Sequence, residues 1–141
     1  MATTTATITL ASADLLSDNL SLSATQTLHK AGTTTGLDGI QYERLEVATG
    51  DIYDLTDQLG ATALGANKAN KVYVANKHTD PTRYVDIYIA AVNIGRLYAG
   101  DWMFIPLEAA SAAQDIGIDA VTVSQVIEFA LIHEGKTLPA S

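Results

Sequence analysis

The chain has 141 residues, of which 48% are hydrophobic and 17% are charged, with a net charge of −8 at pH 7 and no cysteine. This length and composition predict one folded domain that buries roughly 68% of its unfolded surface, and they argue against a disordered chain. The missing cysteines exclude disulfides, thiolate metal sites and a cysteine nucleophile, while the acidic charge, without a lysine or arginine cluster, argues against direct nucleic-acid binding.

Apolar and hydroxyl residues alternate in the first part of the chain. Ile8 and Leu10 alternate with Thr7 and Thr9, and the segment 20–28 repeats the pattern with leucine, serine and threonine. A period of two is typical of a β-strand with one buried face, so we predict two strands joined by a turn over 14–19. Residues 1–6 are predicted to be a flexible arm that precedes a single domain over 7–141.

The middle of the chain combines a predicted strand with a predicted helical turn. The Asp38-Gly39 dipeptide favours a turn before a strand over 40–47. Residues 54–59 are predicted to form a short helix that ends at Gly60. Asp51, Asp54 and Asp57 would then share one helix face, which we interpret as a solvated acidic face near the helix N-terminus and not as a calcium site, because the spacing does not match an EF-hand loop.

The block 72–107 consists mostly of residue types that pack in protein interiors. Turn residues over 76–81 predict a hairpin between 72–75 and 84–89, and a third strand follows from Trp102. Pro106 cannot donate a ladder hydrogen bond, so we expect it at a strand end or a sheet edge. Both faces of the Trp102 strand are apolar, which predicts a central strand or one held between the core and a partner subunit.

The last part of the chain predicts one more strand and, before it, a short helix. Residues 127–131 alternate apolar and smaller or charged side chains, whereas 108–114 is rich in alanine and fits a short helix or a loop. Together the segments predict an all-β, mainly antiparallel domain of the β-sandwich or jelly-roll-like type, with one or two short helical turns.

Residue patterns for catalysis or for a bound cofactor are missing from the sequence. It contains no G-x-S-x-G elbow and no Walker A or G-x-G-x-x-G loop. His29, His78 and His133 share no metal-ligand spacing, although the axis of a trimer would gather three copies of one histidine. We therefore expect a protein that is not an enzyme and that holds no cofactor and no metal.

Targeting and membrane segments are not expected either. The first residues combine neither a basic region nor an apolar run, so a secretory signal is not predicted. All apolar runs are shorter than the about 18 residues that cross a bilayer, so we expect no membrane partner.

Four segments together resemble small structural proteins of tailed bacteriophages. They read VYVANK, VDIYI, IGRLYAGDWMFIPL and VIEFALIHE, over Val72–Lys77, Val85–Ile89, Ile94–Leu107 and Val126–Glu134. The resemblance implies a capsid decoration (cement) protein of the virion, assembled in the host cytoplasm. Such a protein binds the outer shell as a homo-trimer and stabilises it by bridging capsomers, so its partners are the major capsid protein or other virion proteins.

Several residues are candidates for the interface that such a protein needs. Tyr84 and Tyr88 share a strand face opposite the aliphatic residues, which predicts outward contact groups or cover by another part of the chain. The N-terminal segment can add a strand to a neighbour by β-augmentation. The candidate interface residues are Thr7, Ile8, Thr9, Leu10, Tyr84, Tyr88 and Trp102.

Two alternative functions remain open at this point. Within the virion, the chain fits a tail, neck or head-to-tail adaptor subunit, which would assemble into a ring. Outside it, a β-sandwich with exposed tyrosines and acidic loops fits a Ca²⁺-dependent carbohydrate-binding module.

Overall fold

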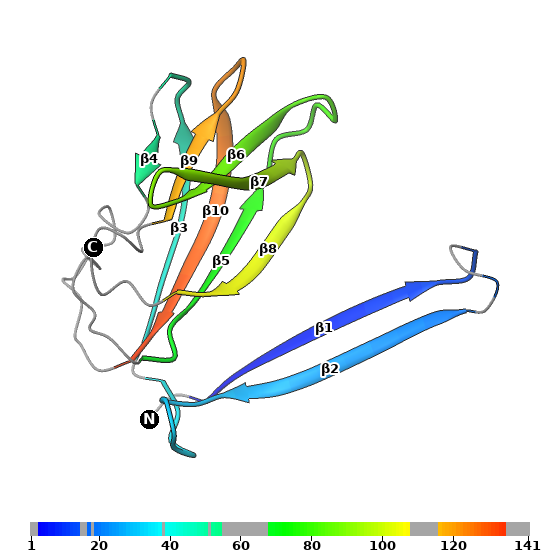
Figure 1. Cartoon of the computed structure of the whole chain (residues 1–141), viewed down its shortest axis with the longest axis vertical. Helices are drawn as coiled ribbons and strands as arrows, with labels where there is room; N and C mark the ends of the chain where they lie inside the picture. The colour runs from blue at the N-terminus through cyan, green and yellow to red at the C-terminus, as the bar shows by residue number, and fades with distance from the viewer. Residues whose placement is uncertain are drawn as a thin grey trace. The chain divides into compact units, whose positions relative to one another are not determined.

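The computed structural model describes residues 3–14, 17, 19–37, 39–50, 52–54, 68–107 and 116–134. These residues form ten β-strands and no helix, so the all-β expectation is confirmed (Figure 1). Among them no helix is long and apolar enough to cross a membrane. The predicted helices over 54–59 and 108–114 lie outside the described residues, apart from the strand residue Asp54.

The chain divides into two compact units, Met1–Leu37 and Asp38–Ser141. This division differs from the predicted arm over 1–6 and single domain over 7–141. Residues 4–6 belong to a strand, and the segment up to Leu37 pairs with itself by backbone hydrogen bonds. The period of two identified the strands correctly but gave no information on which unit they join.

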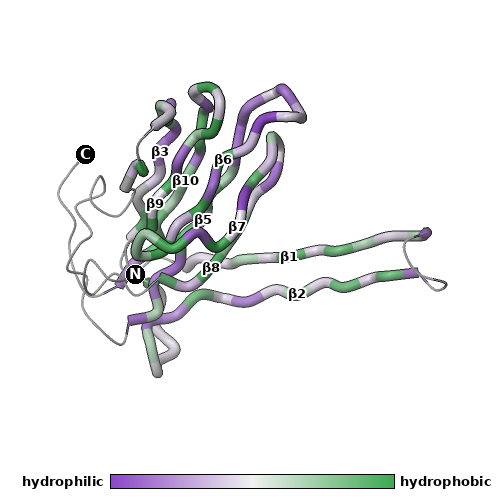
Figure 2. The backbone as a smooth tube through the Cα atoms, turned by 45° about the horizontal axis from the view of Figure 1, so that its top comes forward, coloured by the Kyte–Doolittle hydropathy of each residue, from purple (hydrophilic) through white to green (hydrophobic). Residues whose placement is uncertain are grey.

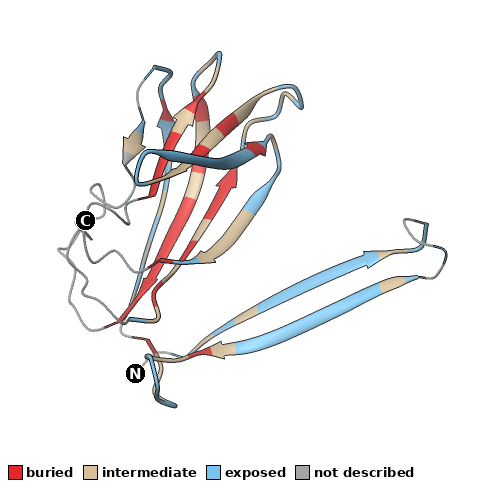
Figure 3. Ribbon diagram, in the orientation of Figure 1, coloured by how far each residue is buried: buried red, intermediate tan, exposed pale blue. Residues whose placement is uncertain are grey.

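The first unit is a two-stranded hairpin. Strand β1 (Thr4–Ser12) pairs antiparallel with β2 (Leu20–Leu28) along all nine residues of each strand. The two strands predicted on either side of 14–19 are therefore partners in one sheet, and residues 15, 16 and 18 of the predicted turn lie outside the described residues. Two thirds of the residues in both strands are exposed, including those in the middle of the hairpin (Figure 3).

The second unit is a sandwich of two four-stranded antiparallel sheets. The first sheet has the order β3-β10-β5-β8, and the second sheet has the order β4-β9-β6-β7. The strand bounds are β3 (Gly39–Val47), β4 (Tyr53–Asp54), β5 (Lys71–Asn76), β6 (Tyr84–Ile89), β7 (Val92–Tyr98), β8 (Trp102–Pro106), β9 (Ile116–Ala120) and β10 (Gln125–His133).

Strand pairing in this unit is nested. The first strand of the unit pairs with the last (β3 with β10), the second with the seventh (β4 with β9), the third with the sixth (β5 with β8) and the fourth with the fifth (β6 with β7). A long antiparallel hairpin rolled into two layers gives this order. The sandwich is established, and the finer assignment of a jelly roll remains a prediction that the nested pairing supports.

The core lies between the two sheets, and most of its aliphatic residues come from β5, β6, β9 and β10, along which hydrophobic residues are frequent (Figure 2). Phe129, at the centre of β10, is fully buried. The predicted alternations over 84–89 and 127–131 are confirmed, since their aliphatic residues face inward. The main buried residues are Val72, Val74, Val85, Ile87, Ile116, Ile118, Ile127, Phe129 and Leu131.

Two predictions about the block 72–107 are wrong. Strands β5 and β6 do not form a hairpin, because β5 pairs with β10 and β8 whereas β6 pairs with β7 and β9 in the other sheet. The Trp102 strand, β8, is at the edge of the first sheet and not at its centre. The edge position agrees with Pro106 at its end. That a partner subunit covers the strand remains a prediction.

The hairpin of β6 and β7 turns through two alanines in the left-handed region, Ala90 (φ 51°) and Ala91 (φ 65°). A two-residue turn with both φ angles positive is favoured by Asn-Gly and strained for other residues. We expect the double variant Ala90→Asn/Ala91→Gly to raise the free energy of unfolding by about 1 kcal/mol. Urea unfolding measures this change, and the control Ala99→Gly, outside the turn, should not reproduce it. A destabilised double variant would contradict the turn geometry.

Candidate interaction surfaces

The outer face of the first sheet gathers aromatic side chains, which we call the aromatic face. Cross-strand register places Tyr42, Ala130, Tyr73 and Phe104 in one row across the sheet. The next row ends in Trp102, beside Ala75. Tyr42 is 59% exposed and Trp102 is 52% exposed, whereas Tyr73 and Phe104 are half-buried. The small alanines between the rings leave room for the rings to lie over the sheet.

Two rings of the aromatic face, those of Tyr73 and Trp102, are nearly parallel. The Tyr73 and Trp102 rings lie 6.3 Å apart between centroids, and their planes differ by 5°. Aromatic side chains at such positions offer large contact areas with little conformational entropy to lose. The aromatic face is therefore suited to bind a flat partner surface.

An ion pair lies in the same row as Trp102. Arg44 donates a hydrogen bond from Nη2 to Glu128 Oε2 at 2.7 Å. The pKa of Glu128 is lowered from its ordinary value of 4.5, chiefly because Tyr42 donates a hydrogen bond to the carboxylate and also because Arg44 does. The same hydrogen bond raises the pKa of Tyr42. The stabilisation from Glu128 is thus present above pH 4.5 and is lost as the pH falls through its lowered pKa.

The candidate residues Tyr84 and Tyr88 lie on the outer face of the second sheet, where both are half-buried. Tyr84 contacts Tyr98 with ring centroids 5.2 Å apart, and the Arg96 guanidinium stacks over the Tyr84 ring at 4.0 Å. The structure therefore separates these tyrosines from Trp102, since the two sheets present opposite outer faces. The side chains of Arg96 and Tyr98 on β7 cover part of Tyr84.

Two carboxylates face each other on this second sheet. Asp86 on β6 is the register partner of Asp119 on β9, and one buried oxygen of each has no hydrogen-bond partner among the described residues. Arg96 Nε lies 3.6 Å from Asp86 Oδ1, too far for a hydrogen bond. Like charges directly opposite each other destabilise a sheet.

Asp119→Asn is therefore expected to stabilise the protein. The amide of the new side chain can donate to Asp86, and the like-charge contact disappears, so the free energy of unfolding should rise by up to about 1 kcal/mol. Thermal and urea unfolding at pH 7 measure the effect. Glu46→Gln, at an exposed position of β3 outside this pair, is the control for charge removal. A less stable Asp119→Asn protein would show that repulsion between the two carboxylates does not decide the energy of this contact.

A buried polar network joins the two sheets at one end. Asn76, fully buried at the end of β5, donates from Nδ2 to Leu97 O of the second sheet and to Gln125 Oε1, both at 3.0 Å. Gln125 in turn donates from Nε2 to Tyr84 O at 2.7 Å. Sequence patterns did not indicate this network, because Asn76 was assigned to a polar turn and Gln125 only precedes an apolar alternation.

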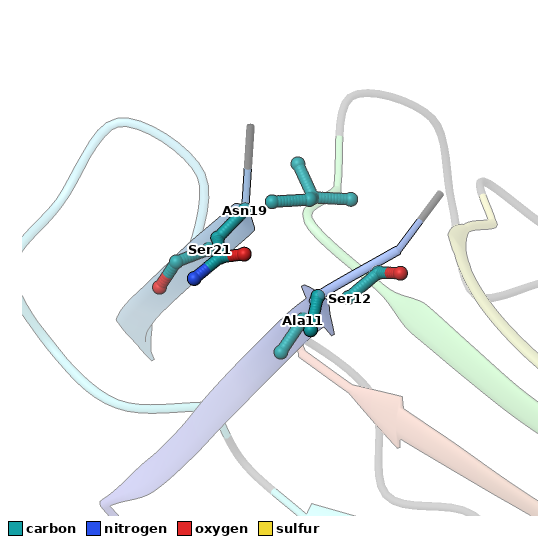
Figure 4. Close-up of a pocket in the computed structure, with 6 residues that line it drawn as sticks. Ala11, Ser12, Asn19 and Ser21 are labelled. Atoms are coloured by element: carbon teal, nitrogen blue, oxygen red, sulfur yellow. The ribbon is translucent and has the colours of Figure 1, made fainter. Parts of the chain in front are cut away.

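The candidate residues Thr7, Ile8, Thr9 and Leu10 lie in β1, inside the hairpin unit. At the far end of this hairpin a shallow hollow of about 360 Å³ is lined by small side chains and Leu20 (Figure 4). Ser12 donates from Oγ to Asp14 Oδ1 at 3.1 Å there. Small neutral groups around an open hollow offer little to hold a ligand. The two faces of the hairpin are therefore better candidates for an interaction surface than the hollow.

The described part of the chain contains no group of three or more histidine, cysteine, aspartate or glutamate residues that could hold a metal ion. His78 Nδ1 accepts a hydrogen bond from the Asp80 backbone amide at 3.0 Å, which is a turn contact. Of the predicted acidic helix face, Asp51 and Asp57 lie outside the described residues.

Comparison with known proteins gives no relative for this chain. No family model matches it, and no curated protein and no solved structure shows a significant match.

Proposed function

We propose that this chain is a structural protein of a tailed-phage virion, a decoration protein that binds the outer capsid shell as a homo-trimer and stabilises it by bridging capsomers. The observation that carries the proposal is the aromatic face. Tryptophan, tyrosine and arginine are the residues that most often dominate protein–protein binding. Here Trp102, Tyr42 and Arg44 lie on the same outer face of the first sheet.

The physical mechanism is selective binding. A cap that binds the expanded shell and not its precursor stabilises the expanded state by mass action. A rigid sandwich presents such a face with little conformational entropy to lose on binding. The motifs over 72–107 and 126–134 that resemble phage structural proteins belong to the strands that build the two sheets.

Add-back of the purified protein to expanded capsids that lack it tests this proposal. We expect saturable binding, and we expect Trp102→Ala to weaken it by about 30-fold, as at an interface hot spot. Val92→Ala, which alters an exposed apolar residue of the second sheet, should change it by less than about threefold. Failure of the wild-type protein to bind any capsid form would contradict the proposal. About a dozen copies per particle would instead indicate a neck or tail subunit.

The parallel Tyr73 and Trp102 rings favour a second candidate function, binding of a carbohydrate. Flat aromatic surfaces stack on the apolar faces of sugar rings, and Glu128 and Arg44 on the same sheet face offer groups that bond hydroxyls. Retarded migration in gels containing a polysaccharide, abolished by Trp102→Ala, would support this candidate. Such stacking needs no metal, so a chelator should leave it unchanged.

A further inference from the structure

The two faces of the β1–β2 hairpin differ in chemistry. Directly opposite residues in an antiparallel pair point to the same face. Ile8 therefore lies beside Ala24, and Leu10 lies beside Leu22, on one face that Leu20 extends. The other face consists of hydroxyl residues and Ala11, and Thr7 and Thr25 are hydrogen-bonded on it, with their Oγ1 atoms 3.0 Å apart.

The apolar face is uncovered within its own unit. Ile8 is 36% exposed, Leu10 is 50% exposed and Leu22 is 45% exposed. In the described part of the chain this sheet has two strands, and a two-stranded hairpin is at best marginally stable in water. A hairpin of this kind is expected to persist when its apolar face is covered.

Charge distribution indicates what covers it. Copies of a chain with a net charge of −8 repel each other, yet neither β1 nor β2 contains a charged residue or a proline. Natural sheet edges that must avoid pairing carry lysine, proline or inward charges. The hairpin is thus a described surface at which copies of this chain can meet without bringing charged side chains together.

The area of the apolar face is small for an interface by itself. A nine-residue ribbon is roughly 30 Å long and 10 Å wide, so one face offers about 300 Å². Two such faces bury about 600 Å² and three faces around an axis bury about 900 Å², both below the roughly 1,200 Å² of a stable interface, so the free strand edges have to add to the contact.

We propose that the hairpins of three copies pack their apolar faces against one another around a threefold axis, with the hydroxyl faces turned to solvent. This inference rests on the proposed homo-trimer, and it names the residues that form it. Ile8, Leu10 and Leu22 would then be buried between subunits, and Thr7, Thr9 and Ser23 would remain exposed.

Single cysteines test this arrangement, because the natural chain has none. Leu10→Cys places a thiol on the apolar face, and Thr9→Cys is the matched control on the hydroxyl face one residue away. Under mild oxidation we expect disulfide-linked dimers to form at least about tenfold faster with Leu10→Cys, because effective concentration rises at a shared axis. Equal rates, or faster linkage of Thr9→Cys, would overturn the proposal.

Charge insertion gives an independent measurement. In sedimentation equilibrium, Leu10→Asp should weaken self-association by about 100-fold, whereas Thr9→Asp should weaken it by less than about threefold. Circular dichroism of both variants checks that the sandwich, a separate compact unit, keeps its melting temperature. A Leu10→Asp protein that associates like the wild type would refute the hairpin contact.

Capsid binding by the same proteins separates the two proposals. If Leu10→Asp remains trimeric while the wild type binds shells, the hairpin inference fails and the decoration function stands. If Leu10→Asp becomes monomeric while the wild type binds no shell, the hairpin inference holds and the decoration function fails.

Discussion

Asn76→Ala is expected to lower the free energy of unfolding by about 3–4 kcal/mol, because it removes three hydrogen bonds from a fully buried site. Leu97 O and Gln125 Oε1 lose their donor, and the backbone amide of His78 loses Asn76 Oδ1, which accepts it at 2.9 Å. Each buried group left unpaired costs about 1–3 kcal/mol. Native domains are stable by about 5–15 kcal/mol, so this is a large share of the total.

Asn93→Ala is the matched control for that variant. Asn93 also accepts a hydrogen bond from a backbone amide two residues ahead, that of Gly95 at 2.9 Å, but it is exposed on β7. Water replaces its contact, and the loss should stay within about 0.5 kcal/mol. Urea unfolding of both variants gives the comparison. Equal losses would show that the network does not join the sheets as described.

Asn76→Asp removes the two hydrogen bonds that the Asn76 side chain donates and keeps the one that it accepts. The aspartate still accepts from His78 but cannot donate to Leu97 or Gln125, and it introduces a buried charge. We expect a loss at least as large as that of alanine at pH 7, with partial recovery as the pH falls and the carboxylate is protonated.

The features of the fold that could be predicted from the sequence are those that depend on residues close together in the chain. Alternation is local, so the strands at 20–28, 84–89 and 127–131 were predictable, and so were the buried faces of the last two. The buried face predicted for 20–28 is wrong, because most of this strand is exposed. Partner choice is not local. The strand pairs β3·β10 and β4·β9 join segments far apart in the chain, and nothing within either segment specifies the other.

Turn chemistry explains the remaining errors. The turn residues over 76–81 predicted a hairpin, but this segment passes from the first sheet to the second. The hairpin that does form turns at Ala90-Ala91, a dipeptide without a turn signal, whose positive φ angles the surrounding strands impose. The sequence named Trp102 as a candidate interface residue, but the aromatic face could be described only with the register that brings Tyr42, Tyr73 and Phe104 onto the same sheet face.

Phe129→Ala is expected to cost about 3–5 kcal/mol, because the ring is fully buried between the sheets and its loss leaves a cavity that rigid strands cannot close. Phe104→Ala removes the same ring from the outer face, where it is half-buried, and should cost about 1 kcal/mol. Guanidinium unfolding at a concentration that keeps the chain monomeric measures both.

This pair of variants also separates folding from binding. Phe129→Ala should weaken capsid binding only through the loss of folded protein, so its affinity per folded molecule should remain that of the wild type. Phe104→Ala should keep the fold and weaken binding, because its ring belongs to the aromatic face beside Tyr73. A Phe104→Ala protein as unstable as Phe129→Ala would mean that the outer face packs within the monomer, and the aromatic face could not then serve as the contact with the shell.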